Sequence, residues 1–262
     1  MGTVETRGVR LDRESSPSLP RARERFVARL DLLPGGRRSA AALAVAFLAA
    51  VAFARVAEDY LTNDPLARWD VSFARWLSEH REPALDELFR AVTFVGSPGF
   101  ALGVAAVAAL LLYRGRRIAE AALLVVVLGC TELVNVVLKL VFHRPRPEVG
   151  FVHLDTYSFP SGHAMISTAA YGVLTVLVLA RLRSGRGRAL LVGGSVALVA
   201  AICFSRLYLG VHYLSDVLGG IAGGAACLAL ALAVYWAAGP RFAAWFAQTR
   251  LDRIGRALTR VP

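Results

Sequence analysis

Long apolar stretches without a charge constrain the fold of this chain more than any other feature. Of its 262 residues, 56% are hydrophobic, more than an average soluble domain carries. A helix needs about 20 apolar residues to cross the hydrocarbon core of a bilayer. The sequence therefore predicts an all-α integral membrane bundle of six transmembrane helices, with five spans or a re-entrant segment as the alternative. The candidate spans are 39–57, 90–113, 118–141, 164–180, 189–205 and 217–238.

The arginines are distributed unequally between the two sides of such a bundle. The net charge is +11, and residues 1–38 hold nine Arg against five acids, while residues 239–262 hold five Arg against one Asp. The connections at 114–120 and 181–188 add three and four Arg, whereas the segment 58–87 holds eight acids and three Arg. Because positive residues accumulate on the cytoplasmic side, we expect both termini in the cytoplasm. The basic excess then needs no nucleic acid partner.

This orientation divides the chain into three parts. Residues 1–38 are expected to form a basic, partly disordered cytoplasmic segment with a short surface helix at Phe26–Leu33. Residues 39–238 form the transmembrane domain, and residues 239–262 form a cytoplasmic basic tail. The outer interfacial loop 58–87 is too long for a turn, and its spaced Trp and Phe residues indicate one or two short helices at the membrane interface.

Polar residues that apolar packing does not require gather in three outward loops. The first run, from Lys139 to Pro147, holds the only lysine of the chain at the outer end of the third span, followed by Arg144 and Arg146. A single lysine there could simply extend its ammonium group to the interface. The two arginines beside it favour an anion site instead, with Arg144 supporting Arg146 or contacting headgroups.

The second run, Pro160-Ser161-Gly162-His163, comes directly before the fourth span. Free amide groups and the helix dipole at such a position favour an anion, and glycine lets a ligand approach the backbone. The Ser161 hydroxyl would donate to a phosphate oxygen or only cap the helix.

The third run joins the fifth and sixth spans, from Ser205 to Asp216. If His212 begins the sixth helix, Asp216 lies one turn along on the same face. The carboxylate would then bond one imidazole nitrogen and leave the other free to attack. A surface His and Asp pair is the simpler alternative, but the two nearby anion-binding runs argue against it.

Polar and small residues inside the spans predict how the helices pack. Glu132 and Asn135 are costly in lipid and are expected to face the bundle interior. Glu132 lies seven residues before Lys139 and would either orient that lysine or make an interhelical hydrogen bond. The glycines at 219, 220, 223 and 224 predict close packing of the sixth span.

The three runs resemble the motifs of the type 2 phosphatidic acid phosphatase (PAP2) superfamily, which read KxxxxxxRP, PSGH and SRxxxxxHxxxD. All three match in full and in order, and the resemblance covers about residues 90–238. It implies a PAP2/haloperoxidase-like core. The matching residues are Lys139, Arg146, Pro147, Pro160, Ser161, Gly162, His163, Ser205, Arg206, His212 and Asp216.

The resemblance implies a phosphate-binding cradle. Lys139, Arg146 and Arg206 would hold the phosphoryl oxygens, and Ser161 with the Gly162 amide would complete the cradle. Arginine suits this task because its planar fork donates two hydrogen bonds at once.

The resemblance also implies the catalytic residues. His212 would be the nucleophile, and Asp216 would orient and polarise it. His163 would protonate the leaving oxygen and then activate the water that hydrolyses the phosphohistidine, which splits one hydrolysis into two displacements. No metal site and no cofactor are expected, because His143 and His153 are loop histidines and a cationic pocket repels a divalent ion.

The implied function is that of a membrane lipid phosphatase whose partners are a lipid phosphate and membrane lipids. An Arg- and Ala-rich chain with one lysine suggests a bacterium of high GC content, so undecaprenyl diphosphate at the outer face of the plasma membrane is the first candidate substrate. Phosphatidylglycerophosphate and phosphatidic acid are the alternatives.

A vanadium-dependent haloperoxidase would share the pocket, but those relatives are soluble. A non-enzymatic lipid-phosphate binder or transporter needs no pair of histidines. The oligomeric state stays open.

Overall fold

The computed structural model describes residues 35–150 and 156–258, with only the helical backbone described from residue 239 onward. The expected helix at Phe26–Leu33 lies outside the described residues. All regular elements in the described part are helices, which confirms the predicted all-α class. They are α2 (Gly36–Thr62), α3 (Pro65–Glu79), α4 (Pro83–Val95), α5 (Pro98–Arg114), α6 (Ile118–Phe142), α7 (Gly162–Leu179), α8 (Gly185–Tyr208) and α9 (Leu214–Leu258).

Five helices of the described chain are each long and apolar enough to cross a membrane, namely α2, α6, α7, α8 and the segment Leu214–Ala238 of α9. The helices α4 and α5 pass the same test only when they are taken together, and the pair bends by 44° at the break between them, as in a broken span or a re-entrant segment. The prediction of one continuous span at 90–113 was therefore wrong. The chain is an integral membrane protein with five long apolar helices and one bent helix pair, which gives five or six spans.

The break between α4 and α5 follows from the sequence Gly96-Ser97-Pro98. A proline disfavours helical geometry in the residue before it, and Ser97 is extended, with ψ of 145°. The Ser97 hydroxyl accepts a hydrogen bond from the Phe100 amide at 3.2 Å and so caps α5. Gly96 also allows close packing, because a Cβ there would overlap the side chain of Ile202 on α8.

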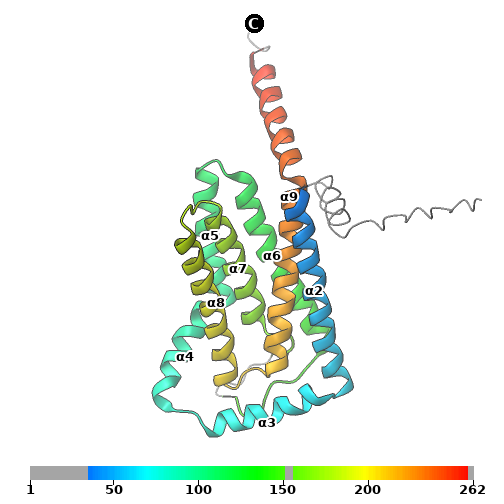
Figure 1. The fold of residues 1–262 in the computed structure, drawn as a ribbon, viewed down its shortest axis with the longest axis vertical. Helices are drawn as coiled ribbons and strands as arrows, with labels where there is room; N and C mark the ends of the chain where they lie inside the picture. The colour runs from blue at the N-terminus through cyan, green and yellow to red at the C-terminus, as the bar shows by residue number, and fades with distance from the viewer. Residues whose placement is uncertain (1–34, 151–155, 259–262) are drawn as a thin grey trace, which may run out of the picture.

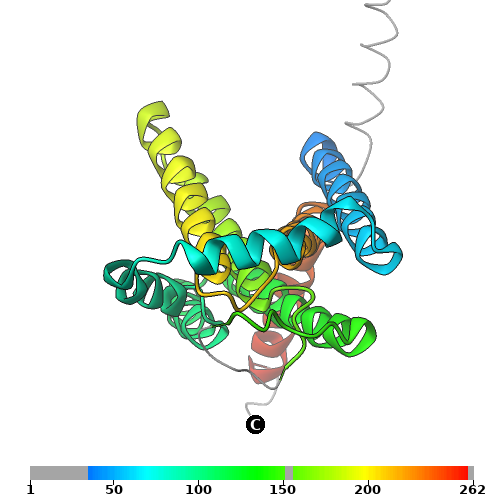
Figure 2. The same cartoon turned by 90° about the horizontal axis from the view of Figure 1, so that it is seen from below.

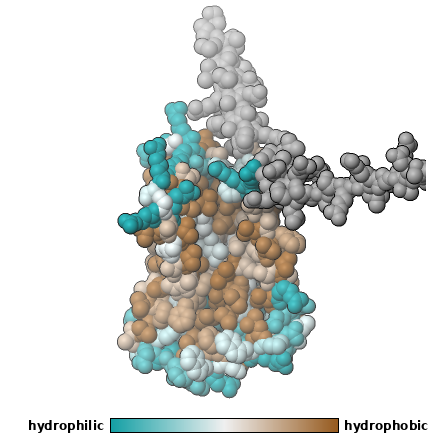
Figure 3. Space-filling model, in the orientation of Figure 1, coloured by the Kyte–Doolittle hydropathy of each residue, from teal (hydrophilic) through white to brown (hydrophobic). Residues whose placement is uncertain are grey.

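The helices of the bundle run along its long axis, and α3 lies across one end of it (Figures 1 and 2). We call this the α3 end; the loop from α6 to α7 and the turn from α8 to α9 meet there. The arginine-rich connections from α5 to α6 and from α7 to α8 lie at the other end, the arginine end (Figure 1). On the face that Figure 3 shows, a hydrophobic band covers the middle of the bundle, with hydrophilic residues at both ends.

The segment 58–87 forms α3 and the first residues of α4, so it contains short helices as predicted, and their place at a membrane interface stays a prediction. Pro65 begins α3 at a position where a missing amide hydrogen is harmless, and Asp59 at the end of α2 accepts a hydrogen bond from the Ala67 amide at 2.8 Å. The buried residues of α3 include Ala74 and Leu77, while Trp69 and Trp76 are exposed. This amphipathic pattern explains why α3 lies flat on the bundle instead of joining it.

The apolar core lies between α6, α7 and α9. Leu124 and Val127 of α6 pack in one cluster with Ile166 and Val173 of α7 and with Leu232 of α9. Four of these side chains, Leu124, Val127, Ile166 and Val173, have no exposed surface at all. Because lipid tails are as apolar as these side chains, their contacts stabilise the bundle mainly through van der Waals packing.

Glycines bring α9 close to α7, as the sequence predicted. A Cβ at Gly220 would lie 2.6 Å from the Ser161 carbonyl oxygen, and a Cβ at Gly219 would lie 2.7 Å from the Phe159 ring. Further along, Gly224 faces the backbone of Met165. The start of α9 is thereby fixed against the PSGH run.

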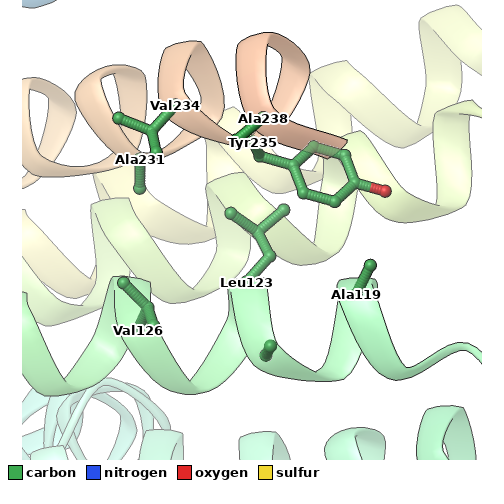
Figure 4. Close-up of a pocket in the computed structure, with 8 residues that line it drawn as sticks. Ala119, Leu123, Val126, Ala231, Val234, Tyr235 and Ala238 are labelled. Atoms are coloured by element: carbon green, nitrogen blue, oxygen red, sulfur yellow. The ribbon is translucent and has the colours of Figure 1, made fainter. Parts of the chain in front are cut away.

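An apolar pocket of about 240 Å³ opens between α6 and α9 near the arginine end (Figure 4). Leu123 and Val126 of α6 line it, together with Val234 and Tyr235 of α9. It carries no charged group and lies far along both helices from the polar loops of the α3 end. This pocket is therefore separate from the cluster of motif residues at the α3 end.

Candidate active site

His212 and Asp216 form the predicted pair at the start of α9. His212 lies two residues before the first helical residue, Leu214, and its Nδ1 is 3.3 Å from Oδ2 of Asp216. The same carboxylate oxygen accepts the Tyr213 amide at 2.9 Å, as in half of a capping box. His212 is 2% exposed and Asp216 is fully buried. The pair is therefore held in one geometry, and the alternative of a surface His and Asp pair is wrong.

Arg146 reaches the other ring nitrogen of His212. Its Nη1 lies 3.2 Å from Nε2 of His212 and donates to the Val211 carbonyl oxygen at 2.7 Å. Its Nε and Nη2 donate to the backbone and hydroxyl oxygens of Thr156 at 2.7 and 2.8 Å. All three nitrogens thus face oxygen or nitrogen acceptors beside the imidazole, where a phosphate would present its own acceptors.

Lys139 is brought to the same place by the last turn of α6. Its Nζ donates to the carbonyl oxygen of Tyr157, and to that of Ser158 at 3.5 Å. The Lys139 ammonium therefore points into the loop that leads to the PSGH run. A lysine that merely extends to the membrane interface would not be bound in this way.

Ser161 occupies the N-cap position of α7, but its side chain caps nothing. The hydroxyl is buried and has no hydrogen-bond partner in the described chain, whereas the Ser161 amide donates to the Asp216 carbonyl oxygen at 2.9 Å. Unsatisfied buried hydroxyls are rare and call for an explanation. The interpretation of Ser161 as a plain helix cap is therefore wrong, and its hydroxyl is available to a ligand.

Arg206 lies in the last turn of α8, beside the residues described above. It is buried, its Nη1 donates to the Thr93 hydroxyl at 2.6 Å, and its Nε lacks a partner within the described residues. Thr93, on α4, therefore orients Arg206. No sequence pattern indicated this role of Thr93, because an isolated threonine in an apolar helix has no distinguishing pattern.

His163 and Gly162 begin α7 next to these cations. His163 lies near enough to Arg206, His212 and Arg146 to interact with all three electrostatically. A Cβ at Gly162 would come within 3.1 Å of the Asn135 side chain. The backbone of the first turn of α7 is thus packed tightly against α6.

The charges at this site favour a bound anion. Burial, and then the charges of Arg206, Arg146 and Lys139, hold the pKa of His212 well below its ordinary value. Burial likewise lowers the pKa of Arg146. Crowded buried cations repel one another and are relieved by an anion among them. The site is therefore suited to a phosphate, with a neutral imidazole facing it.

Arg144 does not support Arg146 or contact headgroups, so that prediction was wrong. It is buried and donates from Nη1 to Asp216 Oδ1 and from Nη2 to Asp70 Oδ2, both at 2.8 Å. Burial alone would lower the pKa of Arg144, but Asp216 and Asp70 raise it above its ordinary value. The sequence missed Asp70 because it is one of eight acids in the segment 58–87 and has no motif around it.

The polar residues inside α6 have separate surroundings. Asn135 is buried, as predicted, and its amide lies 3.5 Å from the Pro160 carbonyl oxygen and 3.6 Å from the Met165 sulfur. Glu132 has a buried carboxylate oxygen without a hydrogen-bond partner in the described residues. Neither predicted bond of Glu132, to Lys139 or to another helix, is formed at that oxygen.

The described residues contain no group of three or more His, Cys, Asp or Glu side chains placed to hold a metal ion. His153 and Asp155 lie outside the described residues. Metal independence therefore stays a prediction.

Two curated proteins are similar to this chain in sequence. Phosphatidylglycerophosphatase B of Bacillus subtilis is 32% identical over 148 residues, which cover 55% of this chain and 72% of that protein. Decaprenylphosphoryl-5-phosphoribose phosphatase of Mycobacterium tuberculosis is 38% identical over 97 residues, covering 35% of this chain and 48% of that protein.

A solved structure and a family profile match this chain as well. A transmembrane PAP2-type phosphatidylglycerolphosphate phosphatase from Bacillus subtilis has a crystal structure that matches with a TM-score of 0.67 and 27% identity, over 71% of this chain and 94% of that one. The sequence profile of the PAP2 superfamily matches residues 120–240, which contain all three motifs. The resemblance seen in the motifs is confirmed, and the chain belongs to the PAP2 superfamily.

Proposed function

We propose that this chain is a metal-independent membrane phosphatase that removes phosphate from a lipid monoester or diphosphate through a phosphohistidine on His212. The observation that carries the proposal is the position of His212: Asp216 holds Nδ1 at 3.3 Å, and Nε2 faces Arg146 at 3.2 Å. A carboxylate on one nitrogen and a cation at the other is the arrangement that directs a neutral imidazole toward a phosphorus atom.

The reaction would proceed in two displacements. The Nε2 lone pair of His212 forms the N–P bond as the P–O bond to the lipid breaks, and the leaving oxygen takes a proton from His163. Water, deprotonated by His163, then attacks phosphorus, and the N–P bond breaks to release inorganic phosphate. Lys139, Arg146 and Arg206 would bind the phosphoryl oxygens throughout.

Two of the buried polar atoms without partners lie at this site and support the cradle. The Ser161 hydroxyl and the Arg206 Nε are buried donors with nothing to bond in the described chain, and leaving such a group unsatisfied costs about 1–3 kcal/mol. Phosphoryl oxygens would satisfy both of them. The Gly162 amide is the further donor that we assign to the cradle.

We place the active site at the outer face of the plasma membrane, with both termini in the cytoplasm. The distribution of charge supports this orientation, because the arginine-rich connections lie at the end of the bundle opposite to α3 and the proposed catalytic residues. A headgroup would enter at the interface while its chains stay in hydrocarbon.

Undecaprenyl diphosphate is the substrate that we propose first, on the basis of this outward site and of the bacterial type of composition. Phosphatidylglycerophosphate is the second candidate, because the relative with 32% identity is named a phosphatidylglycerophosphatase. Phosphatidic acid is the third candidate, because it also carries a terminal phosphate.

The test is phosphate release by purified protein from these three lipids, with EDTA present throughout and His212→Ala as the matched control. We expect release from at least one lipid, unaffected by EDTA and absent in the variant. Binding of the lipids without release would instead identify a lipid-phosphate binder or transporter. Loss of activity on chelation would contradict the metal-independent mechanism.

A further inference from the structure

Asp70, Arg144 and Asp216 form a buried chain of charges that the reaction scheme above does not use. Asp70 lies on α3, Arg144 in the loop after α6, and Asp216 in the first turn of α9. Both carboxylates are fully buried and the Arg144 side chain is 5% exposed. The chain therefore connects the helix that crosses the α3 end to the partner of His212.

The guanidinium of Arg144 is fixed on every side. Its two terminal nitrogens bond one carboxylate each at 2.8 Å. The centre of the Tyr60 ring lies 4.5 Å from its central carbon and that of the Tyr213 ring lies 4.4 Å from it, so that two aromatic rings pack against the guanidinium. Arg144 has no freedom to reach a ligand, and its effect on the reaction must pass through Asp216.

Asp70 also holds the first turn of α9. Its Oδ1 accepts the Ser215 amide at 3.0 Å, and its Oδ2 accepts the Ser215 hydroxyl. A carboxylate from another helix thus serves as the cap at the N-terminus of α9. Ser215 is adjacent to Asp216, so a shift of α3 would move the carboxylate that orients His212.

The stability of the fold alone does not explain this arrangement. Buried ion pairs are weak stabilisers, because desolvation offsets most of the attraction, and apolar replacements of similar size are often as stable. Three buried charges next to the reacting imidazole are therefore better explained by the needs of the reaction.

The reaction needs a negative charge near His212. The charges of the two carboxylates and the one guanidinium add up to a net charge of −1. The imidazole becomes cationic when Nε2 bonds to phosphorus. Without the charge of Asp70, Arg144 would pair with Asp216 alone and would compete with the Nδ1 hydrogen of His212 for that carboxylate. The surplus charge that stabilises the cationic imidazole would then be lost.

We propose that Asp70 and Arg144 are positioning residues for the nucleophile, which fix the orientation of Asp216 and supply the net negative charge that its pairing with His212 requires. This inference rests on the proposed function and deepens it. It makes the docking of α3 a part of the catalytic geometry.

The test compares Asp70→Asn with Asp70→Ala. The amide keeps the shape of Asp70 and an oxygen that can accept the Ser215 amide, but it removes the charge; alanine removes both. We expect Asp70→Asn to lower kcat by roughly 10- to 100-fold, the usual effect of losing a group that orients a catalytic ligand. KM should change by less than about two-fold, because no phosphate-binding residue is touched.

Asp86→Asn is the matched control. Asp86 forms an ion pair with Arg81 at 3.0 Å, also mostly buried and near the α3 end, but at the start of α4 and outside the chain of charges. We expect this variant to keep the wild-type kcat and KM. In a double-mutant cycle, Asp70→Asn combined with Arg144→Gln should lose much less than the product of the two single losses, because both act through Asp216.

Wild-type kcat in Asp70→Asn, together with a loss in Asp70→Ala, would overturn the proposal and leave Asp70 as a structural cap.

A second measurement does not depend on turnover. The chain has only five histidines, so the ¹⁵N imidazole signals of His212 can be assigned by comparison with His212→Ala. They should shift in Asp70→Asn and not in Asp86→Asn. If the wild type releases phosphate from no lipid, the proposed function fails, and these signals still decide this inference: unchanged signals overturn it.

Discussion

The two ring nitrogens of His212 have different partners, and this difference defines its chemistry. Asp216 accepts from Nδ1, which leaves the lone pair on Nε2, and Nε2 faces the cationic side of the site. Arg206, Arg146 and Lys139 add their charges to the effect of burial and keep the imidazole neutral. A neutral histidine that needs no base to activate it is the expected nucleophile for phosphoryl transfer.

Loss of the carboxylate at position 216 should damage catalysis more than binding. Asp216→Asn can turn its amide nitrogen toward Nδ1 and so favour the tautomer that protonates Nε2, which blocks attack. We expect kcat to fall by roughly 10²- to 10⁴-fold with little change in KM. Steady-state kinetics on the best lipid substrate measure both. Equal effects on kcat and KM, or none, would contradict the assigned role.

The lowered pKa of His212 predicts the acid side of the pH profile. A free histidine takes up its proton near pH 6.5. Since the pKa of His212 is lowered in the folded protein, the nucleophile stays neutral below that pH, and kcat/KM should not fall there on its account. After burial, the charge of Arg206 lowers the pKa of His212 most. Arg206→Gln removes this charge, so the acid limb of the kcat/KM profile should move to higher pH, even though the rate also drops.

The profile has to be measured with two substrates whose phosphates have different pKa values. A limb that moves with the substrate belongs to the phosphate, and one that stays belongs to the enzyme. An enzyme limb near pH 6.5 in the wild type, or no displacement in Arg206→Gln, would show that His212 is not the titrating group.

Short glycine and proline runs shape the elements around the site. Gly219 and Gly220 bring α9 against the PSGH run, and Gly210 adopts a φ of +65° in the turn before His212. A Cβ at Gly210 would also lie 2.9 Å from the Val149 carbonyl oxygen. Both the conformation and the space at this turn therefore require glycine.

Gly220→Ala tests the packing of α9 on α7. The added methyl would meet the Ser161 carbonyl oxygen at 2.6 Å, and overpacking of this kind costs about 1–3 kcal/mol. We expect a lower thermal unfolding temperature in detergent and reduced activity, because Ser161 must move. Gly129→Ala on α6 is the control, since nothing lies within 4 Å of its added Cβ. An unchanged Gly220→Ala protein would contradict the packing argument.

The sequence predicted elements better than the contacts between them. Hydrophobic length placed the spans, and motif spacing placed His212, Asp216 and Ser161 at helix starts. The break at Gly96-Ser97-Pro98 was not predicted, because the apolar length of 90–113 favoured one continuous span. Pro98 after Ser97 was nevertheless a visible signal of a helix boundary. The contacts of Arg144 with Asp70 join residues 74 positions apart, and no local pattern reports such a pairing.

At the scale of the whole molecule, the two ends of the bundle differ in charge and in chemistry. The loops that carry the candidate site lie with α3 at one end, and the arginine-rich connections lie at the other (Figure 1). The hydrophobic band between them fixes the bundle across a bilayer. The side on which the site opens then decides which pool of lipid it can serve.

Single cysteines at the two ends test this orientation. Glu79→Cys, at the end of α3, should react with a membrane-impermeant maleimide in intact cells, whereas Arg183→Cys, between α7 and α8, should react only after the cells are opened. Both positions are exposed. The parent protein, labelled under the same conditions, corrects for its three native cysteines. The reverse pattern would place the active site in the cytoplasm.

The central claim is that lipid phosphate passes through a covalent bond to His212. The direct measurement is to quench turnover of a lipid labelled in its terminal phosphate with alkali, which preserves phosphohistidine, and to locate the label on the protein by mass spectrometry. The account predicts label on His212 in the wild type and none in His212→Ala. Label on another residue, or phosphate release that persists in His212→Ala, would contradict it.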